Sequence, residues 1–294
     1  MITVQHLTKS FGRQTVVSDV SFTLGDGSFT ALIGPNGAGK TTILSMLAGL
    51  LKPTKGTVNL EGIKDIRKEI GFLPQYPQFY PWLTGLEFIE MTAKLSGISA
   101  RDTRKEAVKV LEFVGLKDVM HKKTAQYSGG MKQRLGIAQA IVHKPKLLLL
   151  DEPVASLDPV GRREIMNLLK QLQLESTILY STHILNDAEE MTDQLLFLKK
   201  GQVVEKGSLN EIREKFDVPR IRIQFSKIEE AIGYASQSKW STEVEGMVVY
   251  IHITDQFPTM QQVMEELSNS PFTVLKIERN LLTLEEIFMK VVSP

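Results

Sequence analysis

The chain has 294 residues, of which 42% are hydrophobic, and this length and composition allow one large core or two smaller ones. A formal net charge of +1 without any basic run gives no general electrostatic drive toward nucleic acid, so no nucleic-acid partner is expected. The absence of cysteine excludes disulfides and thiolate metal sites. Residues 1–6 lack the pattern of a secretory signal, and no apolar stretch approaches the ~20 residues that a membrane-crossing helix needs.

The first thirty residues predict a small antiparallel layer. Residues 2–7 and 18–24 have strand patterns on either side of a turn-like segment at 12–14. Strand and helix patterns then alternate up to about residue 215. This alternation predicts an α/β fold built on a parallel sheet, with the antiparallel layer beside it.

A glycine-rich loop follows the next predicted strand. Residues 28–33 have the pattern of a buried strand and residues 41–48 that of a helix. Between them the chain fits the pattern G-x-x-x-x-G-K-[ST] with Gly34, Pro35, Asn36, Gly37, Ala38, Gly39, Lys40, Thr41 and Thr42. In such a loop the backbone N–H groups cradle phosphate, the lysine reaches the β- and γ-phosphates, and the hydroxyl after it ligates Mg²⁺. The alternative is an ordinary glycine turn between core elements.

A mostly helical stretch is predicted at about 76–125, with helices at 86–95 and 103–114. A Ser-Gly-Gly segment at 128–130 then leads into an amphipathic helix. Ser128 is a natural N-cap, and the two glycines leave the first helical N–H groups open to an anion. Taken alone, this pattern is more often a simple helix cap.

Two carboxylates end the next apolar run. Residues 146–150 predict a central parallel strand, which would deliver Asp151 and Glu152 to the carboxyl edge of the sheet. Another predicted strand at 176–180 is followed by Ser-Thr-His, ending at His183. The alternatives are a solvated pair of acids and a structural histidine.

The pattern of predicted strands and helices changes after residue 219. The order of the predicted elements is β-α-β-β-α-β, which is that of a ferredoxin-like α+β unit. The strands are expected at 221–225, 240–244, 247–253 and 274–277, and the helices at 228–236 and 258–267. We therefore expect two domains, 1–217 and 218–294.

Taken together, the motifs resemble those of the ATP-binding cassette (ABC) ATPases, over about the first 215 residues. They occur in the order of that family: the phosphate loop, Gln75, Ser128-Gly129-Gly130, Asp151-Glu152, Asp158 and His183. The resemblance implies a P-loop cassette with a parallel sheet core, an antiparallel β layer and a helical subdomain at about 76–125. The chain departs from the commonest pattern at Tyr127 and Met131, which flank the glycines and leave phosphate contact in place.

For catalysis, the resemblance implies hydrolysis of ATP with Mg²⁺. Asp151, Thr41 and Gln75 are then expected to hold the metal and its hydration shell. Glu152 is expected to act as the general base, with Gln75 and His183 beside the reacting water and the γ-phosphate. The competing interpretation of Gln75 is an ordinary surface glutamine.

For nucleotide binding, the resemblance implies a site shared by two chains. Ser128, Gly129 and Gly130 are expected to cap the nucleotide held by Lys40 of a facing subunit, and Asp158 belongs to the same nucleotide-binding set. A homodimer is therefore the expected state. The ring of Phe11 has the flat face needed to stack on adenine, and its alternative is core packing.

The resemblance also implies a separate integral membrane permease and a cytoplasmic location on the inner face of the membrane. A dense aromatic and proline cluster at 76–83 is either its docking groove or the core of the helical subdomain. Residues 281–288 resemble the closing helix of bacterial ABC-2-type exporter ATPases that carry an accessory domain, with an unrelated packing helix as the alternative. An exporter ATPase is thus the expected function. The alternatives are a membrane sensor or regulator complex and a soluble ABC ATPase acting on ribosomes or nucleic acid.

Overall fold

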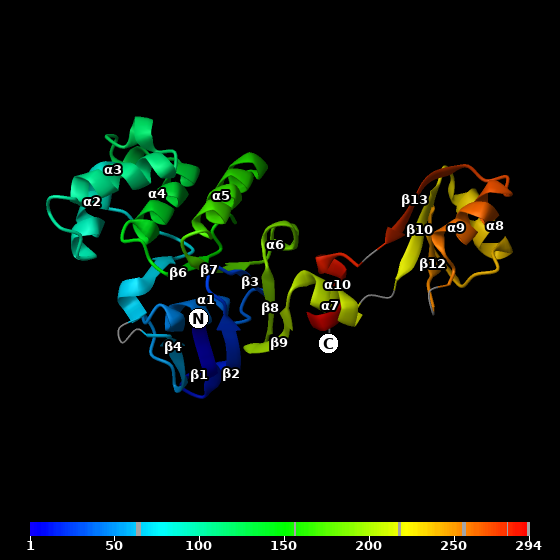
Figure 1. Ribbon diagram of the computed structural model, residues 1–294, viewed down its shortest axis with the longest axis horizontal. Coiled ribbons are helices and arrows are strands. Elements are labelled where there is room, and N and C mark those ends of the chain that lie inside the picture. Colours follow the sequence, from blue (N-terminus) through cyan, green and yellow to red (C-terminus); the bar gives the residue numbers. More distant parts are fainter. Residues whose placement is uncertain (63–65, 156, 217–218, 255–256, 281, 293–294) are drawn as a thin grey trace. The chain divides into compact units, whose positions relative to one another are not determined.

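The chain folds into two compact units, residues 1–209 and the residues from Asn210 onward (Figure 1). The computed structural model describes residues 1–62, 66–155, 157–216, 219–254, 257–280 and 282–292. The predicted boundary at 217/218 lies outside these described residues, and the division itself falls earlier, after Leu209. Helix α7 (Leu209–Phe216) belongs with the second unit, since Arg213 Nε donates a 3.2 Å hydrogen bond to the carbonyl of Leu282.

A six-stranded sheet forms the centre of the first unit, in the order β5-β6-β7-β3-β8-β9. All neighbours are parallel except β8 and β9, which are antiparallel. The predicted parallel sheet is therefore confirmed, and the carboxyl ends of its parallel strands meet at one edge. The strands are β3 (Phe29–Ile33), β5 (Ile70–Leu73), β6 (Leu147–Asp151), β7 (Thr177–Thr182), β8 (Gln194–Lys199) and β9 (Gln202–Gly207).

The predicted antiparallel layer is also present. Strands β1 (Ile2–Phe11) and β2 (Gln14–Leu24) pair antiparallel, and β4 (Lys55–Leu60), which the sequence did not predict, pairs on the other side of β1. Apolar side chains of this layer share one buried cluster with helix α1 (Lys40–Leu47). The phosphate loop thus leads into a helix that is packed on both sheets.

The remaining helices of the first unit include the expected helical segment. A capping box in which Thr84 and Glu87 bond each other's backbone starts helix α2. The helices are α2 (Gly85–Leu95), α3 (Thr103–Phe113), α4 (Gly129–Ile141), α5 (Pro159–Leu172) and α6 (Leu185–Met191), with single 3₁₀ turns η1 (Ile66–Glu69), η2 (Lys117–Val119) and η3 (Thr124–Gln126). Figure 1 shows α2, α3 and α4 grouped together.

The second unit has the predicted β-α-β-β-α-β order. Its sheet has the order β11-β12-β10-β13 with all neighbours antiparallel, and alternate residues of β10, such as Ile221 and Ile223, are buried against the two helices. The elements are β10 (Arg220–Phe225), α8 (Ile228–Gln237), β11 (Thr242–Glu245), β12 (Val248–His252), α9 (Met260–Ser268), β13 (Val274–Asn280) and a closing helix α10 (Leu284–Val292).

Membrane-crossing helices are not found in the described part of the chain: every helix there is too short or too polar to traverse a bilayer.

Candidate functional site

The glycine-rich loop joins the end of β3 to the start of α1. Gly39 is the N-cap residue of α1 and has a φ of 107°, a left-handed conformation that favours glycine. A Cβ on Gly34 would lie 2.6 Å from the carbonyl oxygen of Leu198, so the close approach of β8 also requires glycine there. No side chain caps α1, which leaves its first N–H groups available to a ligand.

A pocket of about 330 Å³ lies over this loop. Two residues from outside the loop region that the sequence analysis selected, Gln75 and Glu152, reach it. Val16, on β2, also lines it and was missed, because nothing in its local sequence marks it. The lining residues are Val16, Pro35, Asn36, Gly37, Ala38, Gly39, Lys40, Thr41, Thr42, Gln75 and Glu152.

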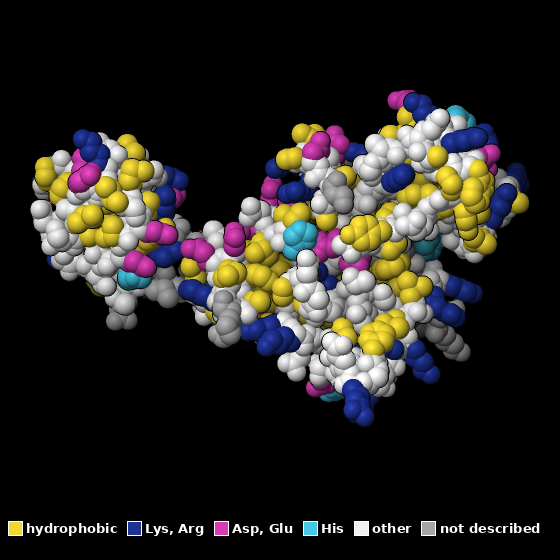
Figure 2. All heavy atoms as spheres, turned by 180° about the vertical axis from the view of Figure 1, so that it is seen from behind, with side chains coloured by type: hydrophobic (Ala, Val, Ile, Leu, Met, Phe, Trp, Pro, Cys, Tyr) yellow, Lys and Arg dark blue, Asp and Glu magenta, His cyan; other side chains and the backbone are white. Residues whose placement is uncertain are grey.

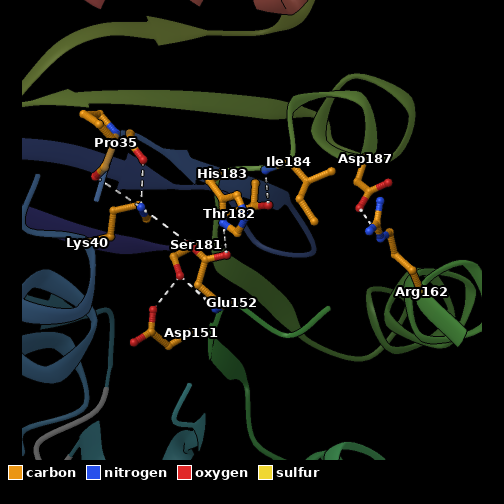
Figure 3. Close-up of polar contacts among 11 residues, drawn as sticks. Pro35, Lys40, Asp151, Glu152, Arg162, Ser181, Thr182, His183, Ile184 and Asp187 are labelled. Carbon is orange, nitrogen blue, oxygen red and sulfur yellow. Dashed lines mark hydrogen bonds and ion pairs between the residues drawn. The ribbon is translucent and has the colours of Figure 1, made fainter. Parts of the chain in front are cut away.

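Lys40 is buried with its ammonium group inside the loop (Figure 3). Its Nζ donates to the carbonyl oxygens of Gly34, at 2.7 Å, and Pro35, at 3.4 Å. The same Nζ lies 3.5 Å from Oε1 of Glu152. The structure therefore places a cation and a carboxylate together in the pocket, although 112 positions separate them in the sequence (152 − 40).

Glu152 follows directly on the last residue of β6 and has a φ of 50°. A left-handed backbone costs a residue other than glycine about 1–3 kcal/mol, and such conformations concentrate at functional sites. The carboxylate is held on its second side, because its Oε2 lies 2.8 Å from Nδ1 of His183. Glu152 is buried while His183 is half-exposed, so the histidine lies at the mouth of the site.

Ser181, at the end of β7, connects the two acids. Its hydroxyl donates to Oδ1 of Asp151 at 2.6 Å and accepts the backbone N–H of Glu152 at 2.9 Å (Figure 3). The sequence analysis assigned no role to Ser181. The signal was available, since Ser181 directly follows the strand predicted at 176–180 and therefore lies at the same edge of the sheet as Asp151.

Three further side chains lie near the site: Tyr180 on β7, Arg162 on α5 and Asp187 on α6. Burial, reinforced by the charges of Asp187 and Glu152, raises the pKa of Tyr180, so this phenol stays neutral beneath the carboxylate. Burial also raises the pKa of Asp187, while Arg162, whose Nε lies 3.7 Å from its Oδ2, opposes the shift (Figure 3).

The residues at the pocket fit a magnesium ion bound with a triphosphate. Thr41 and Gln75 line the pocket, and Asp151 ends the strand that leads into it, so the donors are a hydroxyl, an amide and a carboxylate. Such hard oxygen donors suit Mg²⁺, which usually completes its shell with water and phosphate oxygens. In the described part of the chain no three His, Cys, Asp or Glu side chains form a metal cluster.

The Ser-Gly-Gly segment caps α4. The Oγ of Ser128 accepts the N–H of Met131 at 3.3 Å, as expected for an N-cap. Asp158 caps α5 in the same way, accepting the N–H of Gly161 at 2.7 Å. The described residues that line the phosphate-loop pocket include neither Asp158 nor any residue of 128–130. The structure therefore does not bring these residues to the pocket of their own chain.

Helix α4 is nevertheless tied to the strand that carries the acids. The side-chain amide of Gln133 donates a 2.7 Å hydrogen bond to the carbonyl of Pro153, the residue after Glu152. The contact is partly buried.

Phe11 ends β1 and is 50% exposed, with the ammonium of Lys9 lying 5.0 Å from its ring centre. Core packing, the alternative interpretation of this ring, is therefore wrong. Phe11 is not among the described residues that line the pocket.

Comparison with known proteins identifies the cassette and the second unit separately. A family model described as ABC transporter matches residues 17–155, and one described as ATP-binding protein DrrA1-3-like, C-terminal domain, matches residues 207–292. The uncharacterized ABC transporter ATP-binding protein YxlF of Bacillus subtilis (strain 168) is 40% identical, over 99% of this chain and 99% of its own length. The chain belongs to the ABC transporter ATP-binding protein family.

Other members are similar over most of this ABC ATPase. The bacitracin transport ATP-binding protein BcrA of Enterococcus faecalis is 35% identical, over 100% of this chain and 96% of its own length. Among solved structures, the dimeric post-hydrolysis state of the ATP-binding cassette MJ0796, bound to ADP and Pi, is 31% identical with a TM-score of 0.65. It covers 71% of this chain, and this chain covers 99% of it. The ABC fold and an ATP-hydrolysing activity are thereby established for this chain.

Proposed function

We propose that this ABC ATPase drives a bacterial exporter, as one of two ATPase subunits that dock on a separate integral membrane permease at the cytoplasmic face of the membrane. The observation that carries the proposal is the position of Glu152 in the phosphate-loop pocket, with Lys40 beside one of its carboxylate oxygens and His183 beside the other. The chain has one phosphate loop and one Ser-Gly-Gly segment. The similarity to a bacitracin transport ATP-binding protein over the full chain supports an exporter.

In the proposed reaction, Lys40 and the N–H groups at the start of α1 bind and neutralise the phosphates of ATP. Mg²⁺, held through Thr41 and Asp151 with Gln75 nearby, supplies charge stabilisation when it is bound. Glu152 takes a proton from the attacking water as that water bonds to the γ-phosphorus and ADP leaves. His183 holds Oε2 of this base, and Oε1, which lies 3.5 Å from the Lys40 ammonium, is the oxygen that would take the proton.

The proposed site is completed by a second copy of the chain. Residues 128–130 and Asp158 lie outside the described lining of the pocket. The Oγ of Ser128 takes the N–H of Met131, and the N–H groups of Gly129 and Gly130 at the start of α4 are suited to an anion. In a two-fold dimer, the Ser-Gly-Gly segment of each copy would face the nucleotide of the other, giving two equivalent sites.

A mixing experiment tests this arrangement. Lys40→Ala disables the phosphate loop. Gly129→Asp places a carboxylate on the Ser-Gly-Gly turn, where an added Cβ meets no atom within 4 Å. Each variant alone is expected to lose hydrolysis. An equal mixture should recover up to about a quarter of wild-type single-turnover activity, since half the dimers are mixed and each has one intact site.

The control is a mixture of Lys40→Ala with the Lys40→Ala, Gly129→Asp double variant, whose mixed dimers hold no intact site. Recovery in this control, or a complete lack of it in the first mixture although mixed dimers are present by native mass spectrometry, would contradict the shared site.

The proposed permease dock is formed by exposed aromatic side chains after Gln75. Tyr76, Tyr80 and Trp82 are 70%, 47% and 65% exposed, whereas Phe79 packs edge-on against Phe88 of α2. Tyr80 also contacts the ring of Phe88, so the cluster contributes two rings to the packing against α2 and leaves Tyr76 and Trp82 the most exposed. Figure 2 shows hydrophobic side chains exposed over this helical part of the unit.

Substitution of Trp82 by Glu is expected to release the permease without disabling the ATPase. An exposed aromatic anchor in a protein interface is worth about 2–4 kcal/mol, so co-purification from detergent extracts should fall at least tenfold while basal ATP hydrolysis stays unchanged. Leu95→Glu, at a more exposed apolar position outside the cluster, is the control. If the wild-type chain instead retains ribosomes, DNA or no multi-span membrane protein, the exporter proposal is wrong.

A further inference from the structure

The side chain of Ser181 is fully buried between the two acids of the site. The β6–β7 ladder pairs Asp151 with Ser181, so the hydroxyl lies beside the point at which β6 ends. Its neighbours Asp151 and Glu152 are 1% and 7% exposed. Water therefore has little access to replace the hydrogen bonds that Ser181 makes.

The direction of both hydrogen bonds is fixed by chemistry. A backbone N–H only donates, so the Oγ of Ser181 must accept from Glu152. The single hydroxyl proton is then free to be donated to Oδ1 of Asp151. This bond uses one carboxylate oxygen, and no described residue donates a hydrogen bond to Oδ2, which is left for a cation.

The second bond acts on the backbone of Glu152. That residue has left the strand with a φ of 50°, a conformation that persists only where surrounding contacts hold it. Its N–H is fixed by Ser181 and its carboxylate by His183, both from the end of β7. The end of β7 and the residue after it thus hold both the backbone N–H and the carboxylate of Glu152.

We propose that Ser181 is a positioning residue for ATP hydrolysis: one hydroxyl orients the Asp151 carboxylate toward the metal and locks the left-handed backbone that aims Glu152 at the attacking water. This inference rests on the proposed roles of the two acids. It assigns to Ser181 an effect on the chemical step and on metal affinity, with no contact to ATP itself.

Threonine and valine at position 181 form a matched pair, because they have the same shape and only threonine keeps the hydroxyl. Ser181→Val is expected to lower kcat about 10- to 100-fold with the KM for ATP unchanged, as is usual when a partner that orients a metal ligand is lost. Ser181→Thr should keep kcat within about threefold of wild type. Ser181→Ala supplies a second hydroxyl-free variant without the added methyl group.

A readout that does not depend on turnover comes from Mn²⁺ titration, followed by electron paramagnetic resonance, of the full chain carrying Glu152→Gln and bound to ATP. In that background Ser181→Val should weaken Mn²⁺ about tenfold or more relative to Ser181→Thr. Equal kcat and equal Mn²⁺ affinity for valine and threonine would overturn the inference. A Ser181→Val chain that is inactive only because its melting temperature has fallen, with Ser181→Ala fully active, would overturn it as well.

The Glu152 and Ser181 variants test the two roles separately. If Glu152→Gln alone leaves hydrolysis intact, the role of the base is wrong. If Glu152→Gln abolishes hydrolysis while every Ser181 variant behaves as wild type, only the role of Ser181 is wrong.

Discussion

Replacement of Glu152 by Gln is expected to reduce kcat for ATP hydrolysis by about 10²- to 10⁴-fold, the usual contribution of a general base. Glutamine keeps the shape of the side chain and can still meet Nδ1 of His183, but it has no carboxylate to take a proton from water. ATP affinity should be preserved, because Lys40 and the loop N–H groups are unchanged and lose a competing anion 3.5 Å away. Phosphate release and fluorescent-nucleotide binding would measure the two quantities separately.

The same variant should accumulate as a dimer. ATP that is bound but not cleaved keeps contributing contacts from both copies, so size-exclusion chromatography with MgATP should show twice the monomer mass, and ADP should not. Glu175→Gln, at an exposed glutamate of the same unit, removes the same charge away from the pocket and should change neither result. A Glu152→Gln chain that stays monomeric at saturating MgATP would argue against the two-copy site.

Replacement of Lys40 by Ala should weaken ATP binding about 10- to 100-fold, since a hydrogen bond to a charged group contributes about 1.5–3 kcal/mol. The ammonium already lies in the pocket, held by the loop carbonyls of Gly34 and Pro35, so little reorganisation precedes binding in the native chain. Isothermal titration calorimetry with ATP in the presence of EDTA would measure the contribution of Lys40 to ATP binding without that of the metal.

Loss of Lys40 also removes the ammonium group beside the buried Glu152 carboxylate and leaves it the hydrogen bond with His183. The first unit is therefore expected to lose stability together with affinity. Lys94→Ala, at an exposed lysine of α2, is the control and should alter neither. Unchanged ATP affinity in Lys40→Ala would mean that the loop binds something other than the phosphates.

The parts of the site that the sequence predicts are those encoded locally. The phosphate loop needs glycines and a lysine at fixed spacing, and the short apolar run before Asp151 marks a buried strand that ends at the carboxyl edge. The β-α-β-β-α-β order of the second unit follows in the same way from alternating patterns.

The remaining features depend on contacts between distant segments. Val16 reaches the pocket from β2, and Ser181 meets Asp151 only because β6 and β7 are neighbours. Strand β4 is mostly exposed and polar, so its sequence carries no strand periodicity, and its pairing with β1 decides its structure. The contact of α7 with the loop before α10, which groups α7 with the second unit, leaves no trace in the local sequence pattern.

The Gln133–Pro153 hydrogen bond connects α4 to the residue that follows Glu152, and in the proposed dimer it would link two different nucleotides. In the proposed dimer, the start of α4 would contact the ATP bound by the other chain. Pro153 follows Glu152, the proposed base for the ATP bound by its own chain. A shift of α4 relative to Pro153 would lengthen or break this 2.7 Å hydrogen bond. Hydrolysis at one site would then depend on the state of the other site. The coupling group would be the side-chain amide of Gln133, which contacts neither ATP molecule.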